Sequence, residues 1–351
     1  MSTFKEVIGA LNEITPLELA GSWDNVGLLV EPSNANSLKI DRIFLTNDLT
    51  ENVLDEAIEQ RASMIVSYHP PLFAQFKRLT SKVTAQRIAV KAIENHLPVY
   101  SPHSALDAIN GGINDWTADA LKSIASGKGA SARPIQASMM STNKQFTHKV
   151  EILLNSNDST QLQNELANLD NININTIESK QSSKLEVQCS ESKISLVSQL
   201  IEKNIKSVVS WSVYNGIKYS SDNVGIGRLL TFNEGVSIEQ VIETVKKLFG
   251  LQYIRLGRPQ GGKDRPIKTV AMCAGSGASV ILNTPADLYL TGELSHHEIL
   301  EACSKGNYVI VCDHSNTERG YLSTYKSLIQ SKLANVEIII SKRDADPLVV
   351  V

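Results

Sequence analysis

The pattern of apolar and polar positions predicts alternating strands and helices from about residue 38 to residue 125. Short apolar runs typical of buried strands lie at 43–46, 64–67 and 99–100. Apolar residues at helical spacing predict helices at 52–61, 84–96 and 116–123. Such alternation favours an α/β fold with a largely parallel sheet that is covered on both faces.

A different pattern follows in the middle of the chain. Residues 126–146 are rich in Ser, Ala, Gly and Asn, which predicts a polar linker. The pattern of the next segment predicts four strands, at 149–154, 172–177, 184–189 and 207–213. It predicts two helices between them, at 160–169 and 194–203. This order matches the ferredoxin-like βαββαβ arrangement. Because the segment holds no cluster of metal-ligand residues, we interpret 147–220 as an inserted module for regulation, assembly or access.

The α/β pattern resumes after the insert. Apolar runs predict strands at 224–231 and 269–273, and helical spacing predicts a helix at 238–248. We therefore expect residues 1–146 and 221–351 to form one discontinuous α/β unit.

Composition and charge exclude several classes of function. A net charge of −3 and a pI near 6.2 leave no global basic surface for direct binding of nucleic acid. The four cysteines form no CxxC pair, which favours reduced thiols in a reducing compartment. No apolar run approaches the length of a membrane span. Thr3 and Glu6 fit a helix capping box, so we expect a structural N-terminus and a cytoplasmic protein, with the nucleus and the mitochondrion left open.

Residues that commonly bind metal ions follow four of the predicted strands. Five of the seven histidines lie at these strand ends. The groups are His69, His103 with Asp107, Glu293 with His296 and His297, and His314 with Glu318. In an open α/β sheet the carboxyl ends of the strands meet at a crevice. We therefore expect a metal centre whose ligands come from both ends of the chain.

Three of these groups also fit a purely structural interpretation. Ser315 and Glu318 have the spacing of a capping box, which would leave His314 as a solvated loop residue. Asp107 fits a turn or helix N-cap residue. His69 precedes two prolines and fits a buried, hydrogen-bonded residue. The coincidence of four groups at strand ends nevertheless favours the metal site.

Two further segments each allow two interpretations. His296 and His297 follow Ser295 in a second capping box, so they are either neutral functional imidazoles or two exposed residues at a helix start. The glycine-rich loop at 274–279 either cradles an anion with its backbone N–H groups or forms a tight turn that needs a positive φ.

Several segments in both halves of the chain resemble segments of a known protein family. In the N-terminal half they are Ser22-Trp-Asp-Asn-Val-Gly-Leu28, Asn47-Asp-Leu-Thr50, Tyr68-His-Pro-Pro71 and His103-Ser-Ala-Leu-Asp107. In the C-terminal half they are Gly225-Ile-Gly-Arg228, Cys273-Ala-Gly-Ser-Gly277, Thr291-Gly-Glu-Leu-Ser-His-His297 and His314-Ser-Asn-Thr-Glu318. In these segments the chain resembles the Nif-three-like family, whose members are also described as GTP cyclohydrolase I type 2 homologues.

The resemblance implies two similar α/β halves around a dinuclear metal centre, assembled into homo-oligomers that are often hexamers. It implies metal ligands at His69, Asp107, His314 and Glu318. Glu293 and His297 match a motif that lines the same cleft. Many bacterial members have a second histidine where this chain has Tyr68. Tyr68 could then be a ligand, His103 could substitute, or one metal could bind weakly.

The ligand types limit the metal and the chemistry. Imidazole and carboxylate without thiolate suit zinc, manganese, iron or nickel, and the family implies two ions per chain. Such ions activate water for hydrolysis, with His297 or His103 moving protons and Glu293 orienting one of these two histidines.

We weigh three hypotheses about function. The first is a metal-dependent hydrolase of a nucleotide or related heterocycle, like a GTP cyclohydrolase. The second is a non-catalytic metal-binding adaptor with a protein partner in transcription regulation. The third is an assembly whose histidines are structural.

Overall fold

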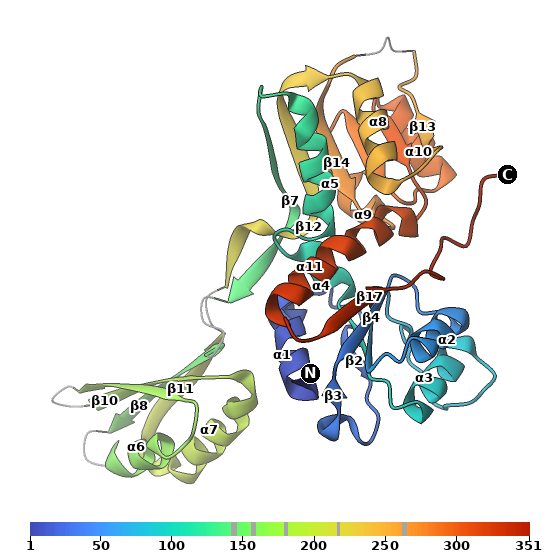
Figure 1. The fold of residues 1–351 in the computed structure, drawn as a ribbon. Coiled ribbons are helices and arrows are strands. Elements are labelled where there is room, and N and C mark those ends of the chain that lie inside the picture. Colours follow the sequence, from blue (N-terminus) through green and yellow to red (C-terminus); the bar gives the residue numbers. More distant parts are fainter. Residues whose placement is uncertain (142–145, 156–158, 179–181, 216–217, 262–264) are drawn as a thin grey trace. The chain divides into compact units, whose positions relative to one another are not determined.

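The computed structural model describes residues 1–351 except 142–145, 156–158, 179–181, 216–217 and 262–264. The chain forms two compact units (Figure 1). The larger unit comprises Met1–Ser138 and Asp222–Val351, and the smaller unit comprises Met139–Ser221.

The first sheet of the larger unit has five strands in the order β17-β4-β5-β6-β2. Their bounds are Glu337–Ile340, Arg42–Thr46, Met64–Ser67, Val99–Ser101 and Gly27–Val30. The strands from β17 to β6 are parallel, and β2 is antiparallel to β6. The largely parallel sheet predicted from the sequence is therefore present. A two-stranded sheet, β1 (Ser2–Thr3) with β3 (Lys39–Ile40), accompanies it.

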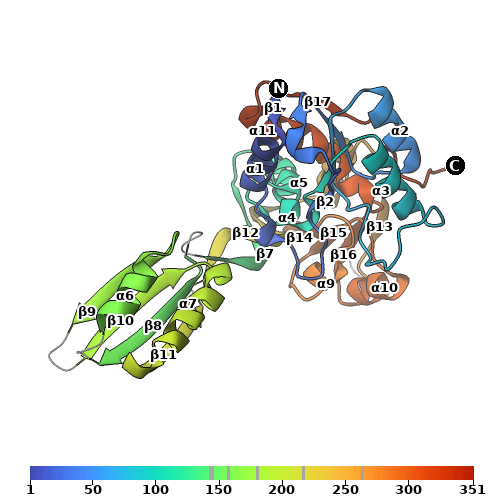
Figure 2. The same ribbon diagram turned by 90° about the horizontal axis from the view of Figure 1, so that it is seen from below.

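Helices cover both faces of this sheet. On one face α2 (Glu51–Glu59) and α3 (Thr84–Glu94) lie side by side (Figure 1) and pack on strand residues such as Phe44 and Ile65. Elsewhere in the unit α1 (Phe4–Ile14) packs against α11 (Leu322–Lys332), which also contacts β17 and β4 (Figure 2). The first and last helices of the chain thus belong to the same half of the unit.

The second sheet has six strands in the order β13-β16-β15-β14-β12-β7. Their bounds are Arg255–Gly257, Tyr308–Val311, Leu288–Thr291, Ile267–Cys273, Lys218–Val236 and Ala130–Ser141. The central strands β14, β15 and β16 are parallel. Glu293 follows the carboxyl end of β15 and His314 follows that of β16, as the sequence predicted, whereas the glycine-rich loop follows β14.

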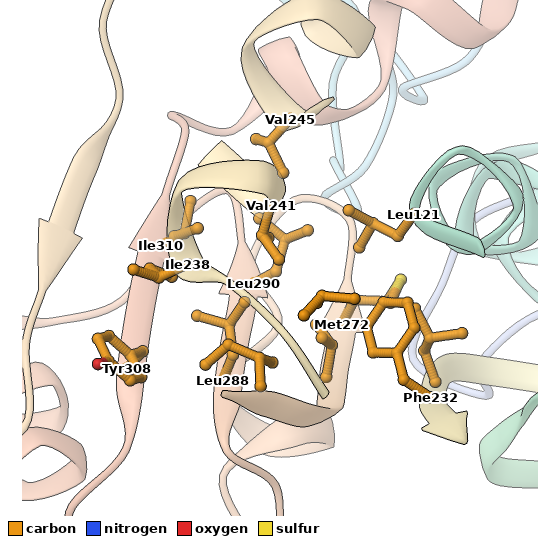
Figure 3. Close-up of a cluster of buried hydrophobic side chains, with 14 of the residues drawn as sticks. Leu121, Phe232, Ile238, Val241, Val245, Met272, Leu288, Leu290, Tyr308 and Ile310 are labelled. Atoms are coloured by element: carbon orange, nitrogen blue, oxygen red, sulfur yellow. The ribbon is translucent and has the colours of Figure 1, made fainter. Parts of the chain in front are cut away.

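The core of the second sheet is built by helices that present apolar stripes. Val241 and Val245 of α8 (Ile238–Phe249) and Leu121 of α5 (Ile113–Lys122) pack on Leu288, Leu290 and Met272 of the strands (Figure 3). Each fully buried aliphatic side chain of this kind stabilises the fold by about 1.5–3 kcal/mol. The opposite face is covered by α9 (Ala278–Ile281) and α10 (His296–Ser304).

The polar linker predicted at 126–146 is largely a strand, so this prediction was wrong. Residues 130–141 form β7 at the edge of the second sheet, and 142–145 lie outside the described residues. Ala130 and Ala132 pack on the core, whereas the alternate residues Ser131 and Arg133 are exposed. The small and polar composition concealed this alternation, because an edge strand with one solvated face needs few large apolar residues.

The smaller unit contains β8 (His148–Asn155), α6 (Ser159–Ala167), β9 (Asn173–Glu178), β10 (Ser182–Cys189), α7 (Glu191–Lys203) and β11 (Val208–Asn215). The strands form an antiparallel sheet in the order β11-β8-β10-β9. This is the order of elements predicted from the sequence. Alternate residues of the central strands, among them Val150 and Val187, pack on both helices.

Several local predictions are also confirmed. Thr3 and Ser295 cap their helices in capping boxes with Glu6 and Glu298. All four cysteines are free and buried. Within the described residues, none of the helices combines the length and apolar character that a membrane crossing requires.

A buried ion pair joins α5 to β12. Arg228, of which 1% is exposed, donates from Nε to Asp115 Oδ1 at 2.5 Å and from Nη2 to Asp115 Oδ2 at 2.7 Å. Its Nη1 also donates to the carbonyls of Gly225 and Gly227. The guanidinium group therefore holds the glycine-containing stretch at 225–227 of β12 against the start of α5.

We predict that Asp115→Ala destabilises the larger unit by about 3–5 kcal/mol, because the variant leaves a buried charge without its partner. Urea unfolding of the full chain measures the effect. Asp119→Ala on the same helix is the matched control, since the exposed pair of Asp119 with Lys122 contributes about 0–1 kcal/mol. Equal destabilisation by the two substitutions would contradict the prediction.

Candidate metal centre

Three histidines in the larger unit have their Nδ1 atoms held by carboxylates. His69, after β5, lies 2.8 Å from Asp48 Oδ1. His103, at the start of α4 (His103–Ala108), lies 2.7 Å from Asp24 Oδ1. His314, after β16, lies 3.0 Å from Glu293 Oε2. A carboxylate on one ring nitrogen fixes the tautomer and leaves the other nitrogen for a metal or a proton, as is usual for ligating histidines.

The Nε2 atoms of two of these histidines meet at one buried carboxylate. His69 Nε2 lies 3.3 Å from Glu318 Oε2, and His314 Nε2 lies 3.3 Å from Glu318 Oε1. Only 2% of the Glu318 side chain is exposed. Asn47 also donates from Nδ2 to Glu318 Oε2 at 3.2 Å. The carboxylate thus connects the ends of strands from both sheets.

Among the residues that the structure describes, His69, His314 and Glu318 form a group that could hold a metal ion. One ligand atom from each lies within 4.8 Å of the others. The sequence predicted all three residues, although they come from distant parts of the chain.

The charges of this group depend on its burial. Burial lowers the pKa of His69, but hydrogen bonds with Asp48 and Glu318 outweigh this effect and raise the pKa to about 10. Burial raises the pKa of Asp48, but its hydrogen bond and charge interaction with His69 dominate and lower that pKa. Without a metal ion, the proton on His69 therefore compensates the surrounding carboxylates.

Asp107, the fourth predicted ligand, faces a neighbouring cavity of ≈ 370 Å³ that Glu318 and His314 also line. Its Oδ1 accepts a hydrogen bond from the Tyr68 hydroxyl at 2.6 Å. Burial raises the pKa of Asp107 to about 6. Burial and the neighbouring Asp107 raise the pKa of Tyr68, so this hydroxyl stays protonated and acts as a donor. Asp107 lies inside α4, so the interpretation as a turn or N-cap residue was wrong.

The glycine-rich loop after β14 forms one wall of the centre. Gly275 has φ +63°, and a Cβ on this residue would lie 2.6 Å from Glu318 Oε1 and 2.9 Å from His314 Nε2. The tight-turn interpretation of this loop is therefore correct. Because α9 has only four residues, the loop does not lead into a long helix that could attract an anion.

The side chains of the centre fit a divalent transition metal. Two imidazoles and a carboxylate suit zinc, manganese, iron or nickel. The nearby Cys273 is not a competing thiolate, because burial raises the pKa of its thiol. The Oδ1 atom of Asn47 is buried beside the triad and has no hydrogen-bond partner among the described residues. Gly275 leaves open the space that a Cβ would fill.

Not every predicted residue reaches this centre. His297 is exposed in the first turn of α10, and its ring neighbour is His296 at 5.4 Å. Its catalytic role stays a prediction. The capping box proposed for Ser315 and Glu318 is wrong, since the Ser315 hydroxyl donates to Asp346 and the Glu318 carboxylate faces the two histidines.

Sequence reasoning missed three supporting residues. Asn47 and Asp48 follow β4 as the histidines follow their strands, so the same strand-end rule could have found them. Asp24 belongs to a turn before β2, and only its buried contact with His103 reveals its role.

The fold and the site define a class of α/β proteins in which two sheets enclose a histidine–carboxylate cluster that could hold a metal ion. The Duf34/NIF3 (NGG1p interacting factor 3) family model matches residues 2–347. The chain belongs to this family, which confirms the resemblance seen in its sequence.

Relatives match over nearly the whole chain. A protein named NIF3-like protein 1 from Dictyostelium discoideum is 49% identical, covering 99% of this chain and 97% of the relative. A protein named NGG1-interacting factor 3 from Saccharomyces cerevisiae is 31% identical, covering 98% of this chain and 96% of the relative. A crystal structure of a Bacillus cereus protein related to NIF3 has a TM-score of 0.67 at 22% identity, covering 99% of this chain and 98% of the other. This last similarity supports the fold alone.

We predict that Asp48→Asn weakens metal binding about 10–100-fold, because an orienting carboxylate raises the basicity of its histidine. Calorimetric titration of metal-stripped protein with Zn²⁺ measures the change. Asp55→Asn removes a carboxylate of α2 that pairs with Lys91 of α3, and it should leave the affinity unchanged. Equal affinities of Asp48→Asn and wild type would contradict the role of Asp48.

We also predict a pH-dependent loss of stability in the metal-stripped protein. The pKa of His69 is raised from 6.5 to about 10, so stability from its protonation is fully present below pH 6.5 and is lost as the pH rises to 10. The stability difference between wild type and His69→Gln should therefore shrink over this range in urea unfolding. The exposed His296→Gln is the control. A difference that stays constant from pH 6 to 10 would refute the assignment.

Proposed function

We propose that this chain is a metal-dependent hydrolase of a nucleotide or related heterocycle, similar to a GTP cyclohydrolase. The observation that carries the proposal is the orientation of three histidines. Each has its Nδ1 held by a carboxylate, and two direct Nε2 at the buried Glu318. Structural histidines rarely need such matched orientation, whereas metal ligands do.

In this proposal, His69, His314 and Glu318 hold one divalent transition metal, and Asp107 contributes to a second position in the adjoining cavity. Bound metal of this kind activates water and orients a substrate. The cavity of ≈ 370 Å³ beside the triad has the size of a small-molecule site.

Two residues of the cavity wall are suited to position a substrate and move a proton. Asp24 holds Nδ1 of His103, so Nε2 is the nitrogen at which His103 would accept a proton. Tyr68 is a neutral donor that fixes one oxygen of Asp107. Glu293 orients His314 and belongs to the support of the centre.

A second candidate function is a non-catalytic metal-binding adaptor. It is supported by the hydrogen bond from Tyr68, which occupies a carboxylate oxygen that a second metal would need. The name of the yeast relative, NGG1-interacting factor 3, also describes a protein interaction. In this alternative the smaller unit would bind the partner. Homo-oligomeric assembly and a cytoplasmic location stay predictions in both cases.

We predict that freshly purified protein contains a transition metal, and that Glu318→Gln loses most of it. Asp107→Ala should abolish hydrolysis in a screen of nucleoside triphosphates, because the variant removes a carboxylate from the cavity. Elemental analysis and product detection on the same samples give the two measurements, with the exposed Asp119→Ala as control.

The outcomes separate the candidate functions. Bound metal without turnover of any nucleotide would favour the adaptor. Persistent hydrolysis by Asp107→Ala would refute the proposed role of Asp107. Wild-type protein without metal would overturn both candidates.

A further inference from the structure

Two large aromatic side chains lie exposed beside the metal cavity. Trp23 lines the cavity and is still 65% exposed, so it lies at the rim. Phe73 is 54% exposed, and its ring centre lies 6.3 Å from the indole at an interplanar angle of 57°. Apolar surface that stays exposed next to a polar cavity is characteristic of a ligand-binding site.

The turn that carries Trp23 is anchored, although the indole is exposed. The indole lies against the backbone of Gly21, where a Cβ would be 2.6 Å from the indole Nε1. The next residue, Asp24, has a fully buried side chain that accepts hydrogen bonds from His103 and from the backbone N–H of Ser104 at 3.1 Å. Trp23 therefore projects from an anchored turn, and little conformational entropy would be lost when a ligand stacks on it.

A further contact ties Phe73 to the same turn. The side chain of Asn25 donates a hydrogen bond to the carbonyl of Leu72, the residue before Phe73. Both aromatic rings also approach His103 edge-on, Trp23 at 5.9 Å and Phe73 at 6.3 Å. His103 in turn lies 5.4 Å from His69 of the triad. A ring stacked on Trp23 would thus lie next to the metal centre.

The basic residues near Phe73 indicate that the ligand also has an anionic group. Residues 70–83 contain Lys77, Arg78 and Lys82 and no acidic residue. These three side chains are exposed and form no ion pair within the part of the chain that the structure describes. The cavity itself is lined by the carboxylates of Asp107 and Glu318. The three basic residues therefore favour an anionic ligand group outside the cavity, along the 70–83 segment.

We propose that Trp23 and Phe73 form an aromatic platform that stacks the planar base of a nucleoside phosphate, with the phosphates directed toward Lys77 and Arg78. The proposal rests on the proposed function, since it names the substrate-binding part of the same site. Stacking itself requires no catalytic step. The platform determines specificity, because a phosphate compound without a ring gains nothing from it.

The test measures binding of GTP and of inorganic triphosphate to the metal-loaded full chain by calorimetry, with tryptophan fluorescence as a second readout. Trp23→Ala should weaken GTP binding about 5–150-fold, the range found for loss of one base–aromatic stack. Binding of triphosphate should not change. Trp23→Phe should retain most of the affinity for GTP, and Tyr253→Ala is the matched control because Tyr253 is 60% exposed beside a different cavity.

The outcomes distinguish the platform from the hydrolase. Selective loss of GTP binding in Trp23→Ala, without turnover by any sample, would support the platform while the hydrolase proposal fails. Turnover in wild type with equal GTP affinity in Trp23→Ala would overturn the platform and leave the hydrolase standing. Equal weakening of GTP and triphosphate, or no GTP binding by metal-loaded wild type, would also overturn the platform.

Discussion

The burial of the Glu318 carboxylate is the constraint on which the centre depends. A carboxylate that leaves water must be compensated by hydrogen bonds or opposite charge, or its burial costs several kcal/mol. Here the compensation comes from His69 and Asn47 of one sheet and from His314 of the other. The need to satisfy one anion therefore keeps the strand ends of two sheets together.

The same constraint explains why the surrounding residues form matched pairs. His69 has Asp48 behind it, and His314 has Glu293 behind it, so each imidazole connects an outer carboxylate with the central one. Such a site is prepared for a cation, because exchange of a proton for a metal ion changes the occupant and leaves the hydrogen-bond network in place. The backbone near it is also unusual. His103 and Asp313 have φ values of +33° and +65°, in a region that side chains other than glycine rarely adopt and that occurs often at functional sites.

The sequence predicted the parts of the structure that depend on local periodicity and on strand ends. The strands before His69 and His314 are visible as apolar runs, and the convergence of strand ends predicts that their ligands lie together. Features that depend on distant pairing could not be predicted in this way. The residues of β7 resemble a linker, because their sequence alone shows neither the pairing with β12 nor the half-solvated position at the edge of the sheet. Asp24 remained hidden because its role behind His103 appears only in three dimensions.

Strand β17 has a consequence for how the chain is made. It pairs in parallel with β4, Glu337 opposite Arg42 and Ile340 opposite Leu45, so the first sheet is completed by almost the last residues of the chain. Glu56 on α2 then accepts hydrogen bonds from the backbone of Lys342 and Arg343, directly after this strand. The β4 edge of the first sheet therefore has no partner until residues 337–340 have been made. Pairing of strands that are so far apart in the sequence is slow. Until then this edge is open to edge-to-edge association with other chains.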